Sequence, residues 1–324
     1  MCTAVSFHGN THCFGRNLDL DYSYDESVTV LPRNFPLLFK TEDCLYNHFA
    51  FIGTAYVYND YPLFYDGTNE YGLSVCGLNF PDNAYYFPPR ENMFNITPYE
   101  IIPWILSLCK TVSEAREKLL NTNVINVPYC EELPLTPLHW MISDQRHSIV
   151  AEPGKDGLKI YDNPSHVLTN NPDFSKQLFS LNNYMSLSNK NPKKTFSDKL
   201  PMTAYSRGMG AMGLPGDWSS QSRFVRASFV RENSVCDMDD LSCVSQFFHI
   251  LKSVAHPRGV VLTDEDKYQI TVYSSCCDTN SMKYYYTTYN NSQLSCVDMR
   301  KEELDGNILS VYPMNKKENV YYHN

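Results

Sequence analysis

The chain has 324 residues, with 27 Lys and Arg against 36 Asp and Glu, which gives a formal net charge of -9. This acidic balance, without a run of basic residues, argues against nucleic acid as a partner, and no apolar run reaches the roughly 18 residues of a membrane span. The eleven cysteines are scattered and follow no secretion signal. We therefore expect reduced, mostly buried thiols in a cytoplasmic protein.

The first chemical feature is Cys2, which directly follows the initiator methionine. Because Met1 is readily trimmed before a small residue, the mature chain is expected to begin with a cysteine that carries a free α-amine. An α-amino group titrates at about 7.7 to 8.0, so one residue can supply both a nucleophile and its general base. The alternative at this point is an ordinary cysteine in a chain that keeps Met1.

Residues 2–7 alternate small or polar with apolar side chains, and Gly9-Asn10 provides a turn before residues 12–15. This pattern predicts a β-hairpin in which Cys2 lies opposite Asn17, within a residue or two of Arg16 and Asp19. A guanidinium near the thiol favours the thiolate, and a carboxylate can hold the α-amine by a hydrogen bond. An ordinary exposed Arg and Asp in a turn is the alternative.

The middle of the chain predicts strands and capped helices in alternating blocks. Residues 49–79 read as strands, with residues 66–69 as a hairpin turn. Capping boxes at Thr97 and Thr111 predict two helices, and Pro103 is expected to kink the first helix or shift its start. Further strands are expected at 138–142, 147–152, 158–161 and 167–169, and a helix from 171–172 through about residue 187.

The last third predicts a loop, a helix and more strands. Residues 208–213 match the dinucleotide-binding fingerprint, but they follow a polar stretch and precede Pro215-Gly216, so we expect a flexible loop and no cofactor. Residues at helical spacing predict a buried helical face made of Leu241, Val244, Phe247, Phe248 and Leu251. Residues 260–311 are again expected to form strands. Blocks of strands that alternate with helices along the chain indicate an α+β sandwich. His8 and His12 flank a turn and no C-x-x-C pair occurs, so no metal site is expected.

Several blocks, in order along the chain, carry a resemblance to a known family. They are Met-Cys-Thr-Ala at the start, Phe14 to Asp19, Cys76 to Pro81, Leu168 to Pro172, and Leu214 to Asp217 followed by Ser222 to Arg226. The chain resembles the choloylglycine hydrolase family of N-terminal-nucleophile hydrolases, most closely the bile salt hydrolases of lactic acid bacteria. The resemblance implies one domain over residues 1–324, a four-layer αββα sandwich with two stacked antiparallel sheets, removal of Met1, and a homotetramer.

The resemblance also implies roles for six residues. Cys2 is the nucleophile, Asn79 and Asn170 stabilise the oxyanion, Arg16 and Arg223 place positive charge near the thiolate, and Asp19 anchors the amine. A buried ion pair between Arg223 and Asp217 with a purely structural role remains the alternative for Arg223.

The resemblance implies an amide hydrolase that releases glycine or taurine from conjugated bile salts, without a cofactor. Because such a substrate has a rigid apolar body, we expect apolar pocket walls, with Leu20, Tyr24 and Phe64 as candidates. Penicillin V is the alternative substrate, and a non-catalytic ligand-binding protein is a third reading. The residues do not separate glycine from taurine conjugates.

Overall fold

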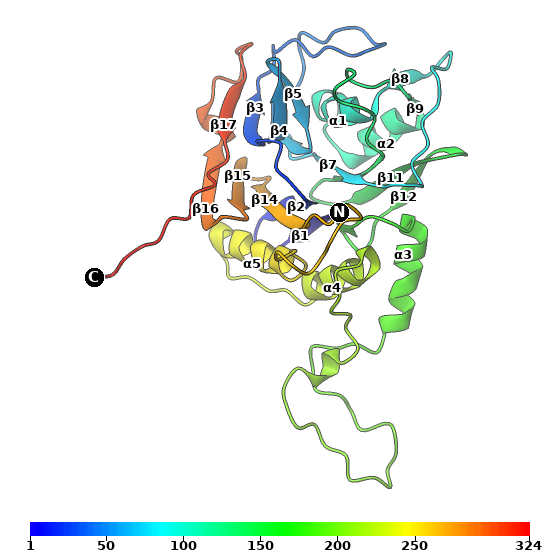
Figure 1. The fold of residues 1–324 in the computed structure, drawn as a ribbon, viewed down its shortest axis with the longest axis vertical. Helices are drawn as coiled ribbons and strands as arrows, with labels where there is room; N and C mark the ends of the chain where they lie inside the picture. The colour runs from blue at the N-terminus through cyan, green and yellow to red at the C-terminus, as the bar shows by residue number, and fades with distance from the viewer.

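The computed structural model describes residues 1–324 and consists of two stacked antiparallel sheets covered by helices on their outer faces (Figure 1). Helices α4 (Ser220–Glu232) and α5 (Asp240–Lys252) pack on one sheet, and α1 (Ile101–Leu108) and α2 (Val112–Leu120) pack on the other. This order of layers confirms the predicted α+β sandwich of the αββα type.

The first sheet has six strands, and it contains the N-terminus. In spatial order its strands are β13 (Val167–Leu168), β1 (Cys2–His8), β2 (His12–Leu20), β14 (Ile270–Asp278), β15 (Lys283–Thr288) and β16 (Asn291–Asp298). Strand β14, from the last fifth of the sequence, pairs with β2 along its length. Residues from the two ends of the sequence therefore lie side by side in this sheet.

The second sheet has nine strands. In spatial order they are β12 (Gly157–Asp162), β11 (Ser148–Gly154), β10 (Leu138–Ser143), β7 (Ser74–Asn79), β6 (Asp66–Asn69), β4 (Phe51–Tyr58), β3 (Ser27–Leu31) and β17 (Ser310–Pro313), with β5 (Tyr61–Phe64) beside β4. A separate parallel pair is formed by β8 (Phe94–Ile96) and β9 (Thr122–Val124).

The remaining helical segments are short. They are α3 (Phe174–Ser180) and the 3-10 turns η1 (Pro98–Glu100), η2 (Leu181–Tyr184), η3 (Met209–Ala211) and η4 (Met299–Lys301). No helix in the chain combines the length and the apolar character that crossing a bilayer requires.

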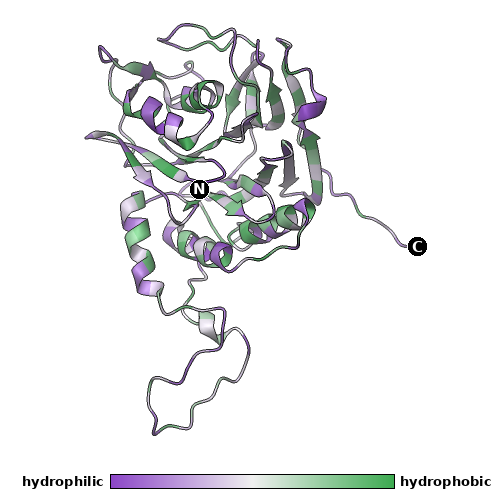
Figure 2. Ribbon diagram, turned by 180° about the vertical axis from the view of Figure 1, so that it is seen from behind, coloured by the Kyte–Doolittle hydropathy of each residue, from purple (hydrophilic) through white to green (hydrophobic).

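Two apolar clusters hold the layers together. One contains 38 buried residues and joins the two sheets to α4 and α5, and the other contains 22 and lies between the second sheet and helices α1 and α2. In Figure 2 the outer helices carry hydrophobic and hydrophilic stretches side by side, as expected of helices that bury one face against a sheet. Burial of one helix face against a sheet is therefore the main stabilising interaction of each outer layer.

The N-terminal hairpin forms as predicted, but its register differs by one residue. Cys2 pairs with Leu18 rather than Asn17, and His8 pairs with His12, so three residues make the turn. The prediction assumed a two-residue turn at Gly9-Asn10, and the third turn residue moves every pair by one position.

The predicted turn at residues 66–69 is wrong, because this segment is strand β6, which pairs with both β4 and β7. Asp, Gly and Asn favour turns, but here the polar groups find buried partners. The Asp66 carboxylate accepts from the hydroxyls of Tyr273 and Tyr284. Asn69 Nδ2 donates to the carbonyl oxygens of Leu106, in the last turn of α1, and of Cys109, which follows it. The chain instead turns at Gly72, with a φ of 84°.

Three helix predictions need adjustment. The capping box is present at Thr97, but at Thr111 only the cap forms, because the Glu114 carboxylate accepts from the Lys110 nitrogen instead. Pro103 lies in the first turn of α1, so it shifts the start rather than kinking the helix. The helix expected through residue 187 ends at Ser180 and continues only as η2. In α5 the predicted face is buried except for Leu241, which is 62% exposed at the first turn.

The C-terminal strands begin at Ile270 rather than residue 260, and helix α4 and strand β3 were not predicted. Residues 208–213 form a loop around η3, as expected.

The expectation of fully reduced cysteines is wrong for one pair, because Cys236 and Cys243 form a disulfide between the α4–α5 connection and the first turn of α5. The other nine cysteines are free.

Close contact between β2 and β14 at Gly15 gives a first prediction. A Cβ atom at Gly15 would lie 1.9 Å from the carbonyl oxygen of Ser275, so Gly15→Ala must force the two strands apart. We expect a loss of about 2 kcal/mol in unfolding free energy, measured by urea denaturation.

Gly216→Ala is the matched control, because a Cβ atom at Gly216 meets nothing within 4 Å. It should leave the urea midpoint unchanged. Equal stability of the two variants would contradict the packing of β2 against β14.

Candidate active site

The pleat of β1 and β2 divides the residues around Cys2 between two faces of the first sheet. Because Cys2 pairs with Leu18 and Ala4 with Arg16, these side chains share the face toward the second sheet. The guanidinium of Arg16 confirms this direction, since it donates to carbonyl oxygens of the second sheet. Thr3 and Asp19 occupy the opposite face, toward α4. The backbone nitrogen of Cys2 lies at the end of the strand, where both faces can reach it.

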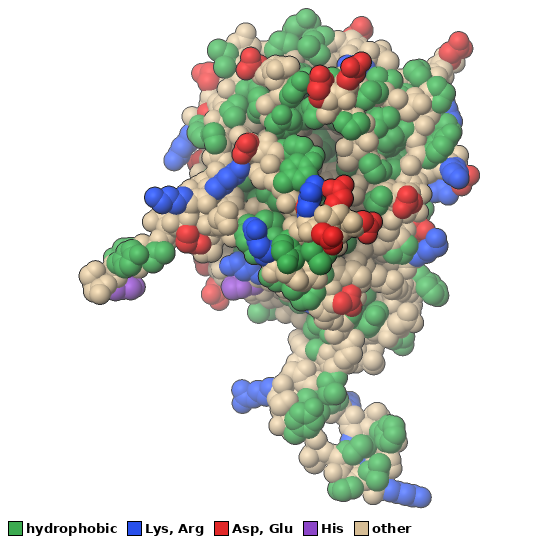
Figure 3. All heavy atoms as spheres, in the orientation of Figure 1, with side chains coloured by type: hydrophobic (Ala, Val, Ile, Leu, Met, Phe, Trp, Pro, Cys, Tyr) green, Lys and Arg blue, Asp and Glu red, His purple; other side chains and the backbone are tan.

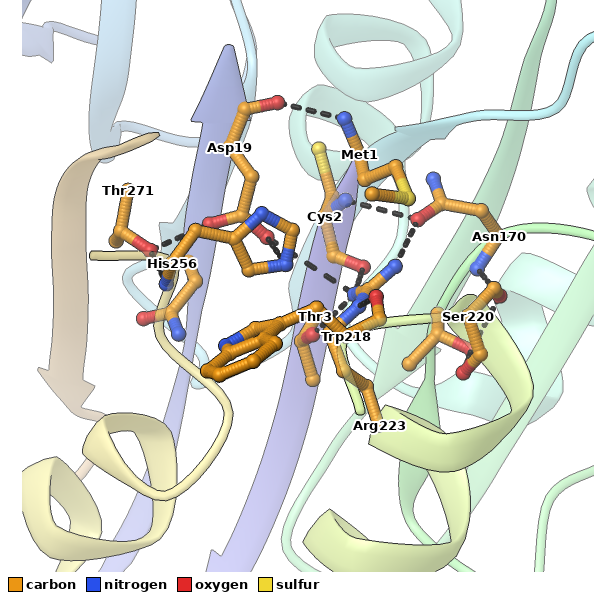
Figure 4. A network of polar contacts seen from close by, with 12 residues as sticks. Met1, Cys2, Thr3, Asp19, Asn170, Trp218, Ser220, Arg223, His256 and Thr271 are labelled. Atoms are coloured by element: carbon orange, nitrogen blue, oxygen red, sulfur yellow. Dashed lines mark hydrogen bonds and ion pairs between the residues drawn. The ribbon is translucent and has the colours of Figure 1, made fainter. Parts of the chain in front are cut away.

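The backbone nitrogen of Cys2 is held by Asn170, which follows β13 at the edge of the same sheet. The Cys2 N–H donates to Asn170 Oδ1 at 2.9 Å, and Asn170 Oδ1 also accepts from Arg223 Nη2 at 2.8 Å. Ser220 Oγ accepts from the backbone nitrogen of Asn170 at 2.8 Å. Figure 4 shows Asn170 beside Cys2 and Arg223, with its side-chain oxygen joined to both, so these two contacts and the one to Ser220 fix its position.

Arg223 enters the site from the first turns of α4. Its side chain is fully buried, and its Nη1 donates to the carbonyl oxygen of Cys2 at 2.5 Å and to Thr3 Oγ1 at 2.7 Å. Burial lowers the pKa of Arg223, and the charges of Asp19 and Cys2 partly oppose that effect. The predicted alternative of an Arg223–Asp217 ion pair is wrong, because the Asp217 carboxylate accepts from the Ser219 backbone and the Ser222 hydroxyl instead.

Arg16 is the buried cation on the thiol face. Its Nη1 donates to the carbonyl oxygens of Tyr65 at 3.0 Å and Gly77 at 2.5 Å. Burial acts to lower the pKa of Arg16, but the negative charge that Cys2 and nearby buried groups can carry outweighs burial and raises it above its ordinary value. The guanidinium therefore stays charged, and a thiolate at Cys2 would be its natural counter-ion.

Asp19 lies on the helix face beside the N-terminus. Its Oδ1 accepts from Thr271 Oγ1 at 2.6 Å, while Oδ2 is buried without a hydrogen bond, 3.9 Å from Arg223 Nη1 and 3.7 Å from His256 Nε2. The amine of Met1 donates to the backbone oxygen of Asp19 at 2.6 Å. A buried carboxylate oxygen without a partner is costly, so this atom is available to a donor that arrives at the chain start.

Asn79 ends β7 on the second sheet and borders the site through Asn170. Its backbone oxygen accepts from Asn170 Nδ2 at 2.7 Å, which links the two asparagines across the gap between the sheets. The side-chain amide of Asn79 makes no hydrogen bond with the protein and is partly exposed. It is therefore free to donate to a substrate oxygen.

The three predicted pocket residues lie in different surroundings. Leu20 packs against the core cluster that contains Cys2, and Tyr24 is 36% exposed with its ring centroid 5.9 Å from that of Tyr56. Phe64 is only 6% exposed and packs on Phe51 in the other cluster, beneath α1 and α2. The structure does not bring Phe64 toward Cys2, because the side chains of β5 alternate and Phe64 faces the helices.

Two residues of the site were not predicted, His256 and Thr271. Both contact Asp19, and Thr271 Oγ1 also accepts from the His256 backbone nitrogen at 2.8 Å. Burial lowers the pKa of His256 to about 4, so its ring is neutral near pH 7. Neither residue carries a sequence signal for this position, since only the pairing of β14 with β2 brings them to Asp19.

The network around Arg223 gives a stability prediction. Arg223→Gln leaves the Cys2 carbonyl, Thr3 and Asn170 without their shared donor and removes the cation nearest to buried Asp19. We expect a loss of about 3 kcal/mol or more in unfolding free energy, measured by urea denaturation. Arg207→Gln changes the same charge at an exposed position and should change stability little. A difference of less than about 1 kcal/mol between the two variants would contradict the network.

Comparison with known proteins identifies the family of the chain. The sequence pattern of the linear amide C–N hydrolases, choloylglycine hydrolase family, matches residues 2–312. The chain is 48% identical, over 99% of both chains, to a bile salt hydrolase/transferase of Lactiplantibacillus plantarum. A mutant conjugated bile acid hydrolase from Clostridium perfringens superposes with a TM-score of 0.92 at 39% identity over 100% of both chains.

A penicillin V acylase from Agrobacterium tumefaciens superposes with a TM-score of 0.76 at 20% identity, covering 96% of this chain and 90% of the other, which shows the shared fold alone. The family match, in contrast, spans nearly the whole chain and includes the segments that carry Cys2, Asn79, Asn170 and Arg223. The chain therefore belongs to the choloylglycine hydrolase family of linear amide C–N hydrolases.

Proposed function

We propose that this protein hydrolyses the amide bond of glycine- or taurine-conjugated bile salts, with Cys2 as its nucleophile after removal of Met1. The observation that carries the proposal is the position of Cys2 at the start of a central strand, among Arg16, Asp19, Asn170 and Arg223. Relatives described as bile salt hydrolases match the chain over nearly its full length, which supports the choice of substrate.

Removal of Met1 is required by the chemistry. With Met1 in place, the nitrogen of Cys2 is an amide without basic character, and the Cys2 side chain is 2% exposed. Trimming converts that nitrogen into an amine in the same place, at the end of the strand and within reach of Asn170 Oδ1. It also removes the residue whose side chain lies beside Cys2 and Asn170 in Figure 4.

The first half of the reaction acylates the sulfur. The Cys2 amine accepts the thiol proton, and the sulfur attacks the amide carbonyl carbon of the substrate. The negative charge that develops on the carbonyl oxygen is stabilised by the amides of Asn79 and Asn170, and loss of one such donor typically costs about 3 kcal/mol. The amine then gives its proton to the departing nitrogen, so the C–N bond breaks and an acyl thioester remains.

The second half releases the bile acid. Water gives a proton to the Cys2 amine as its oxygen attacks the thioester carbon, and the sulfur leaves with that proton as a thiol. Arg16, on the thiol face, balances charge on sulfur, while Asp19 and Arg223, on the helix face, hold the amine and its neighbours. No metal or cofactor takes part in this scheme.

The apolar body of the substrate needs a wall on the thiol face. Leu20, which packs against the apolar cluster that contains Cys2, and Tyr24, which lies in the loop after β2, are our candidates for it. Penicillin V is the second candidate substrate, with a smaller aromatic acyl group.

A cytoplasmic location is also proposed, and nine free cysteines support it.

The substrate prediction compares two amides. The purified protein should release glycine or taurine from conjugated bile salts faster than it cleaves penicillin V, measured as free amine under the same conditions. Cys2→Ala should lower both rates by roughly a thousandfold or more while keeping the fold. Cys44→Ala, at another free cysteine, should keep full activity.

Faster turnover of penicillin V would assign the protein to that substrate instead. Wild-type-like hydrolysis by Cys2→Ala would contradict the mechanism. Absence of hydrolysis with either substrate would favour the third reading, a binding protein without catalysis.

We also propose that the protein is a homo-oligomer, a homotetramer by family resemblance, assembled through residues 188–213. This segment, called the arm below, projects from the body and carries hydrophobic side chains beside Lys and Arg (Figures 1 and 3). Its base is closed by a hydrogen bond from the Ser188 nitrogen to the Gly210 oxygen at 2.9 Å. Phe196 is 84% exposed and Tyr205 is 81% exposed, and large apolar side chains on a closed projection are typical of an interface.

The assembly prediction uses the arm. We expect the wild type to be oligomeric by light scattering, and the double variant Phe196→Asp and Tyr205→Asp to shift toward the 37.3 kDa single chain. Val235→Asp is the control, because Val235 is 83% exposed outside the arm. A monomeric wild type, or an unchanged mass in the double variant, would contradict this assembly.

A further inference from the structure

A cavity of about 590 Å³ lies on the helix face of the first sheet, where the C-terminal end of α5 meets β14 and β15. Its walls include Arg226 from α4, Lys252 from α5, and Thr287 from β15. Figure 1 shows α4 and α5 beneath strands β14 and β15, the elements that carry several of the lining residues. The proposed mechanism makes no use of this cavity.

The first sheet separates the cavity from the thiol of Cys2. Thr271 and Ser274 line the cavity, and they pair across β14 and β2 with Asp19 and Asn17. Asn17 Nδ2 donates to the Leu251 oxygen of α5, so this face of the sheet looks toward the helices. Cys2 occupies the other face. The cavity is therefore distinct from the space in which an acyl group can reach the sulfur.

The charge of the cavity is positive although the whole chain is acidic. None of its 14 lining residues is Asp or Glu, whereas two of them, Arg226 and Lys252, are cations. Neither cation forms an ion pair within 4 Å. Arg226 Nη1 donates to the backbone oxygens of Pro215 and Asp217, which leaves Nη2 without a partner in the protein.

Three carboxylates lie near the cavity, and none of them forms an ion pair with Arg226 or Lys252. Asp217, the acid closest to Arg226, accepts from the Ser219 nitrogen and the Ser222 hydroxyl. Glu318 reaches Ser292 at the rim, and Asp19 lies behind Thr271. The donors without a partner in the protein are Arg226 Nη2, Lys252 Nζ and the hydroxyl of Thr287. Guanidinium, ammonium and hydroxyl groups are the donors from which tetrahedral and planar anions accept hydrogen bonds.

We propose that this cavity is a second binding site, for a small anion of the sulfate, sulfonate or carboxylate class held by Arg226, Lys252 and Thr287. The site borders the catalytic centre without opening into it, because His256 and Thr271 form part of its wall and both contact Asp19 on their other side. Two sources of this chemistry exist: a free inorganic anion, or, on the proposed function, the glycine or taurine that the reaction releases.

The test is direct binding to the full-length enzyme, which requires no turnover and so stands apart from the test of the proposed function. Sodium sulfate, taurine and glycine are titrated separately by calorimetry at constant ionic strength. We expect one saturable sulfate site per chain. Lys252→Gln and Arg226→Gln should each weaken binding by about tenfold or more, because each removes a charge-assisted contact. Lys155→Gln removes an exposed charge elsewhere and should leave binding unchanged.

Competition then identifies the source. Displacement of sulfate by taurine or glycine assigns the site to the released amino acid, and its absence assigns the site to a free inorganic anion. Lys252 is exposed, so Lys252→Gln keeps the fold even if Arg226→Gln does not. The proposal is overturned if sulfate shows no saturable binding, or if Lys252→Gln binds sulfate as tightly as the wild type.

Discussion

The hydrogen bonds between Asn170, Arg223 and the start of β1 are the constraint on which the rest of the site depends. Asn170 Oδ1 accepts from the Cys2 nitrogen and from Arg223, and Arg223 in turn holds the Cys2 oxygen. A chain terminus normally frays, since little ties it down. Here the first peptide unit is fixed in a buried sheet, so the sulfur and nitrogen of one residue keep a constant position.

The pleat of the sheet gives the two reactive atoms of Cys2 different surroundings. The sulfur shares its face with Arg16, while Asp19 and Arg223 approach the start of the strand from the opposite face. Opposite faces of one strand therefore separate the charge that stabilises a thiolate from the charge that orients an amine. The same separation leaves the helix face free to carry the cationic cavity.

The sequence allowed the fold class, the hairpin and the group of Cys2, Arg16 and Asp19 to be predicted, because these residues are close along the chain. The family resemblance added Asn79, Asn170 and Arg223. Local pattern could not find His256 or Thr271, which reach Asp19 only through a strand pair more than 250 residues apart in sequence. It also failed at β6, where buried partners override the turn preference of Asp and Gly.

The most direct test of the account is the intact mass of the enzyme that turns over substrate, together with labelling of its α-amine. The account predicts an active species that lacks methionine and whose Cys2 amine is free to react. Because that amine is the proposed base, blocking it should stop hydrolysis. An active species that keeps Met1, or that remains active with a blocked Cys2 amine, would contradict the account.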